Sequence, residues 1–192
     1  MLVIGNGESR KDIDISAFNE TKVGCNAIVR DFFVNHLVCV DRRMVEEVLQ
    51  LSSFDKIYTR QDWINSYTSN KNVTTVPKLL EDGTKRWDEP FQWGSGPYAV
   101  LLSAKLCKGP TVRLVGFDLH SATNTVNNLY KDTSNYDPAD KNAVDPKYWV
   151  HQISKVFEWF PQLHFKIYQK EDWILPNSWQ KDNVSLDNLD NL

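Results

Sequence analysis

Short apolar runs separated by polar stretches and glycine turns recur along most of this chain. Apolar runs of this length, bounded by turn signals, predict buried strands. The expected strands cover residues 2–4, 22–25, 37–40, 56–59, 111–115 and 166–168, with a further short strand at 73–76. Because such strands alternate with helical segments, the pattern predicts an α/β fold with a Rossmann-like, mostly parallel sheet and helices on both faces.

Three segments carry helix signals. Asp41 is the expected N-cap of a helix over 42–51, and a glycine turn at 94–96 precedes a helix over 98–106. The third helix begins at Asp145-Pro146 and runs to about residue 160. Its apolar positions follow helical spacing: Trp149, Ile153, Val156, Phe157 and Phe160. A polar stretch from Ser9 to Phe18 predicts a further short helix, and residues 66–92 are polar and irregular.

The elements predict one domain. Residues 1–181 form the expected Rossmann-like nucleotide-binding domain, and the polar tail 182–192 is expected to be frayed. Residues 119–145 are rich in Asn, Asp, Ser and Thr and predict a long loop, which in a compact domain is often functional.

Composition narrows the classes of function. A formal net charge of -3 with scattered basic residues argues against nucleic acid as a partner. The 3 cysteines lack CxxC spacing, which argues against a disulfide framework or a zinc site and favours a reducing compartment. No signal peptide or membrane-spanning run is visible, so we expect a cytoplasmic protein with no membrane span.

Candidate binding residues gather at the expected strand ends, where parallel sheets bind ligands. Gly5 and Gly7 let the backbone approach a ligand closely, and Asn6 offers an amide that both donates and accepts hydrogen bonds. Ser9 would cap a helix whose N-terminus faces a phosphate. The alternative is a tight strand-to-helix turn without a ligand.

Three further positions have two interpretations each. Asn26 either reads a base or ribose hydroxyl or forms an Asx turn. Ser95 and Gly96 either form an anion site at a helix N-terminus, or Ser95 simply caps the helix. Asp118 either binds a ligand hydroxyl or satisfies N–H groups of its own loop.

Histidine and tyrosine supply the candidate chemistry. At about 100° per residue, His151 falls opposite the Trp149–Ile153–Phe157 stripe, on the face with Ser154, and therefore faces either solvent or a cleft. An imidazole is a good general base near neutral pH. His120, Tyr130 and Tyr136 lie in or beside the polar loop and either hold a phosphate or anchor the loop.

The order of these motifs resembles a known group of proteins. Val3-Ile4-Gly5-Asn6-Gly7-Glu8-Ser9, Gly24-Cys25-Asn26, Gly94-Ser95-Gly96-Pro97-Tyr98-Ala99 and Leu114-Val115-Gly116-Phe117-Asp118 resemble the bacterial sialyltransferases that make lipooligosaccharide. They also resemble Rossmann-like proteins that begin with Gly-Asn-Gly-Pro-Ser, which include motility accessory glycosyltransferases and archaeal pterin diphosphokinases. Glu8 stands at the usual proline, and His120 at an expected phosphate-binding tyrosine.

The resemblance implies metal-independent transfer from a cytidine monophosphate sugar to a glycan or small-molecule acceptor, with no cofactor. Asn6, Asn26, Ser95 and Gly96 would lie at the nucleotide, and Tyr130 and Tyr136 at the departing phosphate. His151 matches the family's general base. A magnesium-dependent diphosphokinase, a non-catalytic nucleotide-binding protein and a homo-oligomer stay open as alternatives.

Overall fold

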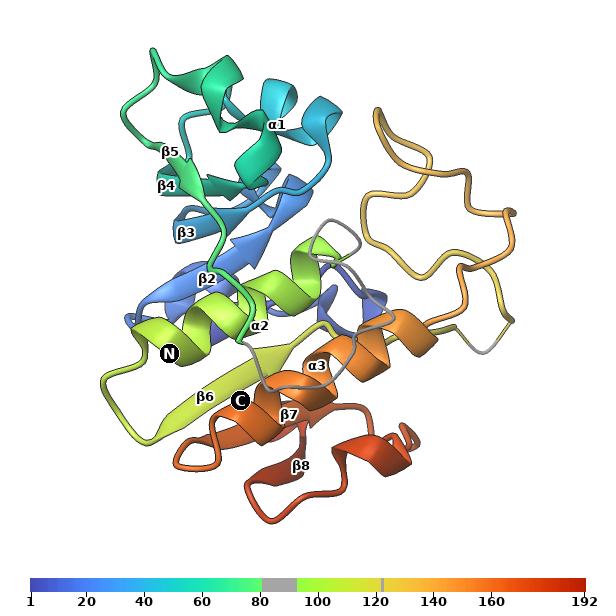
Figure 1. Ribbon diagram of the computed structural model, residues 1–192. Coiled ribbons are helices and arrows are strands. Elements are labelled where there is room, and N and C mark those ends of the chain that lie inside the picture. The colour runs from blue at the N-terminus through green and yellow to red at the C-terminus, as the bar shows by residue number, and fades with distance from the viewer. Residues whose placement is uncertain (81–92, 122) are drawn as a thin grey trace.

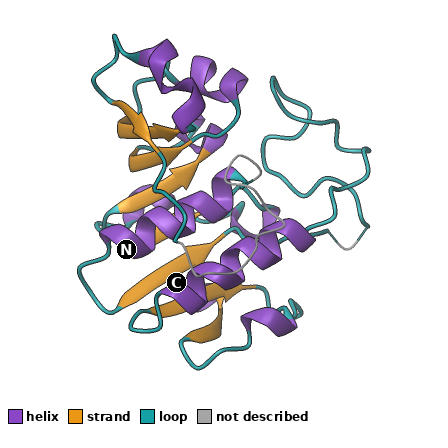
Figure 2. Cartoon of the chain, viewed as in Figure 1, coloured by secondary structure: helices purple, strands orange, loops and turns teal. Residues whose placement is uncertain are grey.

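The computed structural model describes residues 1–80, 93–121 and 123–192. Within them lies one all-parallel sheet of eight strands, with helices on both faces (Figures 1 and 2). The Rossmann-like fold predicted from the pattern is confirmed. The strands are β1 (Leu2–Ile4), β2 (Lys22–Cys25), β3 (Val34–Val38), β4 (Phe54–Thr59), β5 (Val73–Thr75), β6 (Thr111–Val115), β7 (His164–Gln169) and β8 (Val184–Asn188).

The helices connect these strands. The α-helices are α1 (Arg42–Val48), α2 (Ser95–Leu106) and α3 (Lys147–Trp159). Short 3-10 helices complete the connections: η1 (Glu8–Arg10), η2 (Ile15–Ala17), η3 (Asn26–Arg30), η4 (Gln61–Tyr67), η6 (Asn177–Trp179) and η7 (Leu189–Asn191). The single helix expected between Ser9 and Phe18 is therefore two separate 3-10 turns. As expected, the Asp41 side chain caps α1 by accepting from the Arg43 N–H.

Strand order places a crevice at one point of the sheet. The order is β5-β4-β3-β2-β1-β6-β7-β8, so the chain builds outward from β1 to β5 and then returns to continue from β6 on the other side of β1. Such a reversal is the topological switch point at which doubly wound sheets bind ligands. The carboxyl ends of β1 and β6 are therefore the expected site.

Successive side chains of a strand point to opposite faces of the sheet, so the hydrophobic core is divided into one cluster on each face. Val3 packs with α2 and α3 on one face, whereas Leu2 and Ile4 pack with α1 and η3 on the other. The middle helix α2 is buried along most of its length, because it lies against the sheet and α3 (Figure 1). This explains why its apolar residues show no strong single stripe.

The C-terminal segment differs from the expectation. Residues 182–192 were expected to be a frayed tail, but β8 pairs in parallel with β7 from Phe165↔Val184 to Gln169↔Asn188. Polar side chains at Asp187 and Asn188 concealed the strand, because an edge strand exposes one side to solvent. The domain therefore includes the edge strand β8.

Candidate functional site

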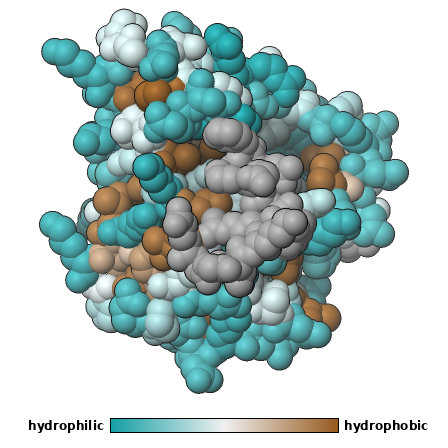
Figure 3. Space-filling model, viewed as in Figure 1, coloured by the Kyte–Doolittle hydropathy of each residue, from teal (hydrophilic) through white to brown (hydrophobic). Residues whose placement is uncertain are grey.

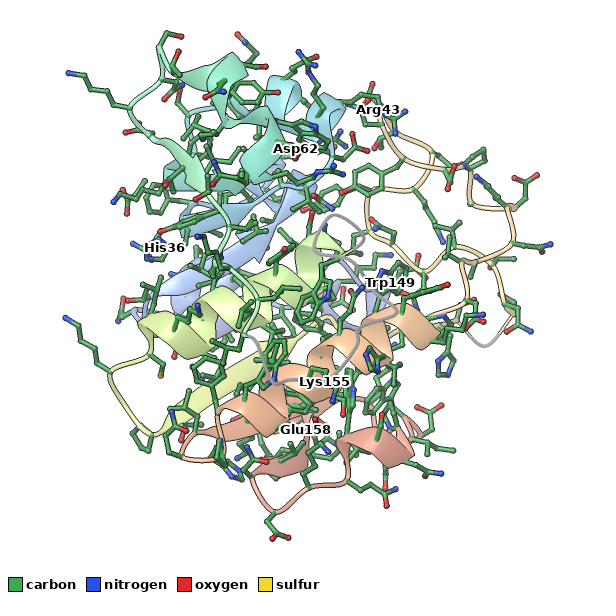
Figure 4. The ribbon with its side chains drawn as sticks, in the orientation of Figure 1. His36, Arg43, Asp62, Trp149, Lys155 and Glu158 are labelled. Atoms are coloured by element: carbon green, nitrogen blue, oxygen red, sulfur yellow. The ribbon has the colours of Figure 1, made fainter. Side chains whose placement is uncertain are left out.

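A cavity of about 310 Å³ lies at the switch point, beyond the carboxyl ends of β1, β2 and β6. We call it the first cavity. The N-terminus of α2 and one face of α3 complete its walls. Seven of the predicted binding residues line it: Gly5, Asn6, Gly7, Asn26, Ser95, Gly96 and Asp118. Figure 4 shows Trp149, another lining residue, at the start of α3.

The glycine turn packs against the end of β6. The Gly5 N–H donates to Val115 O at 2.8 Å, and the Gly7 N–H donates to Gly116 O at 2.9 Å. A Cβ on Gly5 would lie 2.2 Å from Gly116 O, and one on Gly7 would lie 2.4 Å from the Asp118 carboxyl carbon. The two glycines are therefore required for this close backbone approach.

Asn6 uses its amide to fasten the strand ends together. Its Nδ2 donates to Cys25 O at 3.0 Å and to the Tyr136 hydroxyl at 3.4 Å, and its Oδ1 accepts from Arg10 at 3.3 Å. The sequence indicated a ligand-binding amide here. In the structure this amide joins the ends of β1 and β2 to the loop that carries Tyr136.

Asn26 differs from Asn6 in its backbone conformation and in the hydrogen bonding of its side-chain oxygen. Its backbone is left-handed, with φ at +52°, and its Oδ1 is buried without a hydrogen-bond partner among the described residues. A buried amide oxygen without a partner costs about 1–3 kcal/mol. Strained residues with unsatisfied polar atoms gather at functional sites. Leu119, which also lines the first cavity, is left-handed too, with φ at +67°.

The N-terminus of α2 faces the first cavity without a side-chain cap. Gly94 is the N-cap residue, and the Ser95 hydroxyl accepts instead from the Val40 N–H at 3.0 Å. Capping by Ser95, one of the two interpretations offered above, is therefore wrong. The first-turn N–H groups of a 12-residue helix give this wall a partial positive charge.

Asp118 anchors the loop that forms the floor. Its carboxylate accepts from the Ser9 N–H at 2.8 Å, from the Ser9 hydroxyl and from Gln169 Nε2 at 2.9 Å. The side chain is only 6% exposed. These contacts agree with the interpretation in which Asp118 satisfies loop N–H groups, and they account for the position of Ser9.

A second cavity, of about 520 Å³, shares Asp118 and Asn127 with the first. It lies beyond the ends of β6 and β7, and three predicted residues line it: Ser9, Asp118 and His120. Asn127 accepts from the Glu8 N–H at 2.8 Å and donates to His120 O at 3.0 Å. The shared wall is thus held by hydrogen bonds on both sides.

Tyr130 lies in a buried polar cluster rather than in a cavity wall. Its hydroxyl donates to Asp31 at 2.8 Å and accepts from Arg10 at 3.2 Å, and the residue is 5% exposed. Burial raises the pKa of both Tyr130 and Tyr136 well above the ordinary range. The Tyr136 hydroxyl accepts from Asn6 and from the Ala27 N–H, and the residue lines a third cavity of about 410 Å³ together with Asn26 and Arg43.

Arg10 is the residue that sequence reasoning missed. It is 2% exposed and donates to Gly5 O at 2.6 Å, to Asn6 Oδ1 and to Tyr130. No carboxylate of the described residues forms an ion pair with it. In the sequence it follows the glycine turn as an ordinary polar residue, so only long-range contacts reveal its burial.

His151 lies on α3 but lines neither the first nor the second cavity among their described residues. Trp149 and Ile153, on the opposite face, line the first cavity. Ser154, expected on a polar face, is 5% exposed and donates to Ser178 O at 2.9 Å, because η6 packs against that side of α3. His151 is therefore not among the described residues that line the cavity shared by the predicted binding residues.

Cys25 also lines the first cavity, but burial raises the pKa of its thiol to about 12. A thiol in this state is a poor nucleophile at neutral pH. Within the described residues, no group of three or more His, Cys, Asp or Glu side chains is arranged to hold a metal ion.

Comparison of the chain with known protein families, with curated proteins and with solved structures gives no match. None of the helices in the described ranges combines the length and the apolar character needed to cross a bilayer. Figure 3 shows a largely hydrophilic surface on the face of the molecule that carries α2 and α3, with apolar side chains in several separate patches.

Proposed function

We propose that this chain binds a nucleotide in the first cavity and serves as a metal-independent transferase that takes a sugar from that nucleotide. The observation that carries the binding is Asn26, which lines a cavity at the sheet's switch point and has a buried Oδ1 without a hydrogen-bond partner among the described residues. An amide oxygen in this position recognises a donor, such as the exocyclic amine of a base or a ribose hydroxyl.

The α2 N-terminus, which also lines the first cavity, supports the same proposal. Its N–H groups favour a phosphate, and Gly94 and Gly96 at this N-terminus both line the cavity. The volume of about 310 Å³ is within the range of small-ligand pockets. Cytidine monophosphate is the nucleotide that the resemblance to sialyltransferases favours.

The test is thermal stabilisation by a nucleotide panel, because a ligand that binds only the native state raises the melting temperature. The panel contains cytidine, uridine, adenosine and guanosine monophosphates and ATP, each with and without magnesium. We expect a shift with cytidine monophosphate that does not need magnesium. No shift with any nucleotide would overturn the proposal, and a shift with ATP and magnesium alone would favour the diphosphokinase alternative.

Two glycine variants make the test specific. Asn26→Gly keeps the left-handed backbone and removes the unpartnered oxygen, so we expect roughly tenfold weaker binding. Asn124→Gly is the matched control, because Asn124 is also left-handed, with φ at +55°, but is exposed and lines neither cavity. Equal nucleotide affinity in both variants would contradict the role proposed for Asn26.

A non-catalytic nucleotide-binding protein is the second candidate. It is favoured by the position of His151, which lies outside both cavities, and by the fully engaged hydroxyl of Tyr130. Hydrolysis of a cytidine monophosphate sugar by the wild type and by His151→Asn separates the candidates. Turnover that is lost in the variant supports the transferase, and binding without turnover supports the second candidate.

A further inference from the structure

We propose that the second cavity binds a neutral or amine-bearing sugar attached to the nucleotide, and not an acidic sugar or a polyphosphate. This inference rests on the proposed function, since it extends the ligand from the first cavity into the second. The two cavities share Asp118 and Asn127 in their walls, so they lie side by side, and we infer that one ligand with two parts occupies both.

The polar side chains of the second cavity suit hydroxyl groups. Ser121, Thr123 and Asn127 contribute hydroxyl and amide groups, and the His120 imidazole makes no hydrogen bond to any described residue. An imidazole without a partner beside a cavity can both donate to and accept from a sugar hydroxyl. The cavity therefore offers many weak polar contacts, which a polyhydroxylated group can use at the same time.

Trp173 supplies an aromatic surface that is already held in place. Its Nε1 donates to Asp118 O at 3.0 Å, and its ring packs against Trp179 with centroids 6.2 Å apart. The side chain is nevertheless partly exposed and lines the second cavity. A fixed aromatic face binds the apolar side of a ring-shaped ligand with little loss of side-chain entropy.

The negative charge of the second cavity disfavours acidic sugars and polyphosphates. Three carboxylates line the cavity, at Glu8, Asp118 and Asp172, against the single ammonium of Lys170. Glu8 pairs with Lys131, whereas Asp172 has no ion pair with any described residue. The remaining acidic excess repels a sugar carboxylate or a chain of phosphates and favours a neutral or cationic group.

The indole N–H resonances provide a readout for each cavity separately. Trp149 lines the first cavity and Trp173 the second, so their signals, assigned with Trp149→Phe and Trp173→Phe, report the two sites independently. Cytidine and uridine nucleotides are the probes, each compared with a neutral, an aminated and an acidic sugar derivative. We expect bare nucleotides to shift Trp149 alone and the neutral or aminated derivatives to shift both signals.

Calorimetry gives the size of the effect. A neutral or aminated sugar should strengthen binding roughly fivefold to tenfold over the bare nucleotide, as one or two net hydrogen bonds would. His120→Ala should remove that gain, Asp172→Ala should let the acidic derivative bind more tightly, and both variants should leave the affinity for the bare nucleotide unchanged. Asp182→Ala is the control, because Asp182 is exposed and precedes β8 at the opposite end of the sheet.

The outcomes separate the two proposals. If a nucleotide shifts Trp149 but no sugar derivative shifts Trp173 or binds more tightly, the sugar inference is wrong and nucleotide binding stands. An acidic sugar that binds as well as a neutral one also overturns it. If no probe shifts Trp149, nucleotide binding in the first cavity is itself wrong.

Discussion

Two polar regions lie side by side at the carboxyl ends of the strands, and they differ in how their hydrogen bonds are satisfied. In the arginine–tyrosine cluster, formed by Arg10, Tyr130 and Asp31 with Asn6, side chains supply one another's donors and acceptors. In the wall of the first cavity, Asn26 has a left-handed backbone and a buried oxygen that finds no partner in the described part of the chain. Satisfied polar groups stabilise the fold, whereas an unsatisfied one marks a place where a ligand supplies the missing donor.

The comparison reverses part of the expectation from sequence. Asn6 and Asn26 are the same residue type at the ends of neighbouring strands, and both were predicted to bind the nucleotide. Asn6 shares its amide among Cys25, Tyr136 and Arg10, so we assign it to the cluster. Only Asn26 retains an unused acceptor.

The largest effect that we expect is a loss of stability when the close backbone contact between Gly5 and Gly116 is disturbed. Gly5→Ala places a Cβ 2.2 Å from Gly116 O, a backbone atom that cannot move without shifting β6. We expect the free energy of unfolding to fall by about 3 kcal/mol or more. Urea denaturation measures it. Gly109→Ala is the control, because a Cβ there meets nothing within 4 Å, and an equal loss in that variant would contradict the packing explanation.

The next effect tests the cluster itself. Tyr130→Phe removes a hydroxyl that serves both Asp31 and Arg10, and we expect unfolding to become easier by about 2 kcal/mol. Nucleotide affinity should remain unchanged, as measured by calorimetry. A large loss of affinity without loss of stability would instead return Tyr130 to the phosphate role that the sequence suggested.

A smaller effect on the free energy of unfolding should distinguish Asn6 from Asn26. Asn6→Ala removes three hydrogen bonds and should lower the free energy of unfolding by about 1–2 kcal/mol. Asn26→Gly removes an unsatisfied atom and relieves a left-handed backbone, so stability should stay within about 1 kcal/mol of wild type or increase. Chemical denaturation of both variants provides the measurement. Similar losses in the two variants would show that the asparagines do not differ in role.

The smallest effect lies at the edge strand β8, far from both regions. A hydrogen bond from Lys166, with one from Asn191, lowers the pKa of Asp187 to about 2 from an ordinary value of 3.8. Since the folded pKa is the lower one, the contribution to stability is present above about pH 4 and is lost as the pH falls toward 2.

Asp187→Asn and Lys166→Met should each flatten this part of the profile of unfolding free energy against pH. A wild-type profile without any such slope, or variants that retain it, would show that the pair does not form in solution. The same experiment checks that β8 is folded onto β7, because a frayed tail could not lower the pKa.

Local pattern predicted much of the architecture. Strands β2 and β6 lie where the apolar runs predicted them, and Asp41 caps α1 as expected. These features depend on neighbouring residues along the chain, so the sequence contains the signals for them. The glycine turn, Asn26, Asp118 and the α2 N-terminus were also placed correctly beside one another, because carboxyl ends of parallel strands share one edge of the sheet.

Tertiary structure decided the functions of the individual side chains. The burial of Arg10, the engagement of the Tyr130 hydroxyl and the position of His151 depend on contacts between segments far apart in the chain. Periodicity places His151 on a helix face but cannot tell which element packs against that face, and here η6 covers the neighbouring Ser154. The sequence by itself determined where polar groups gather, and the packing of the loop and helices determined which of them a ligand can still use.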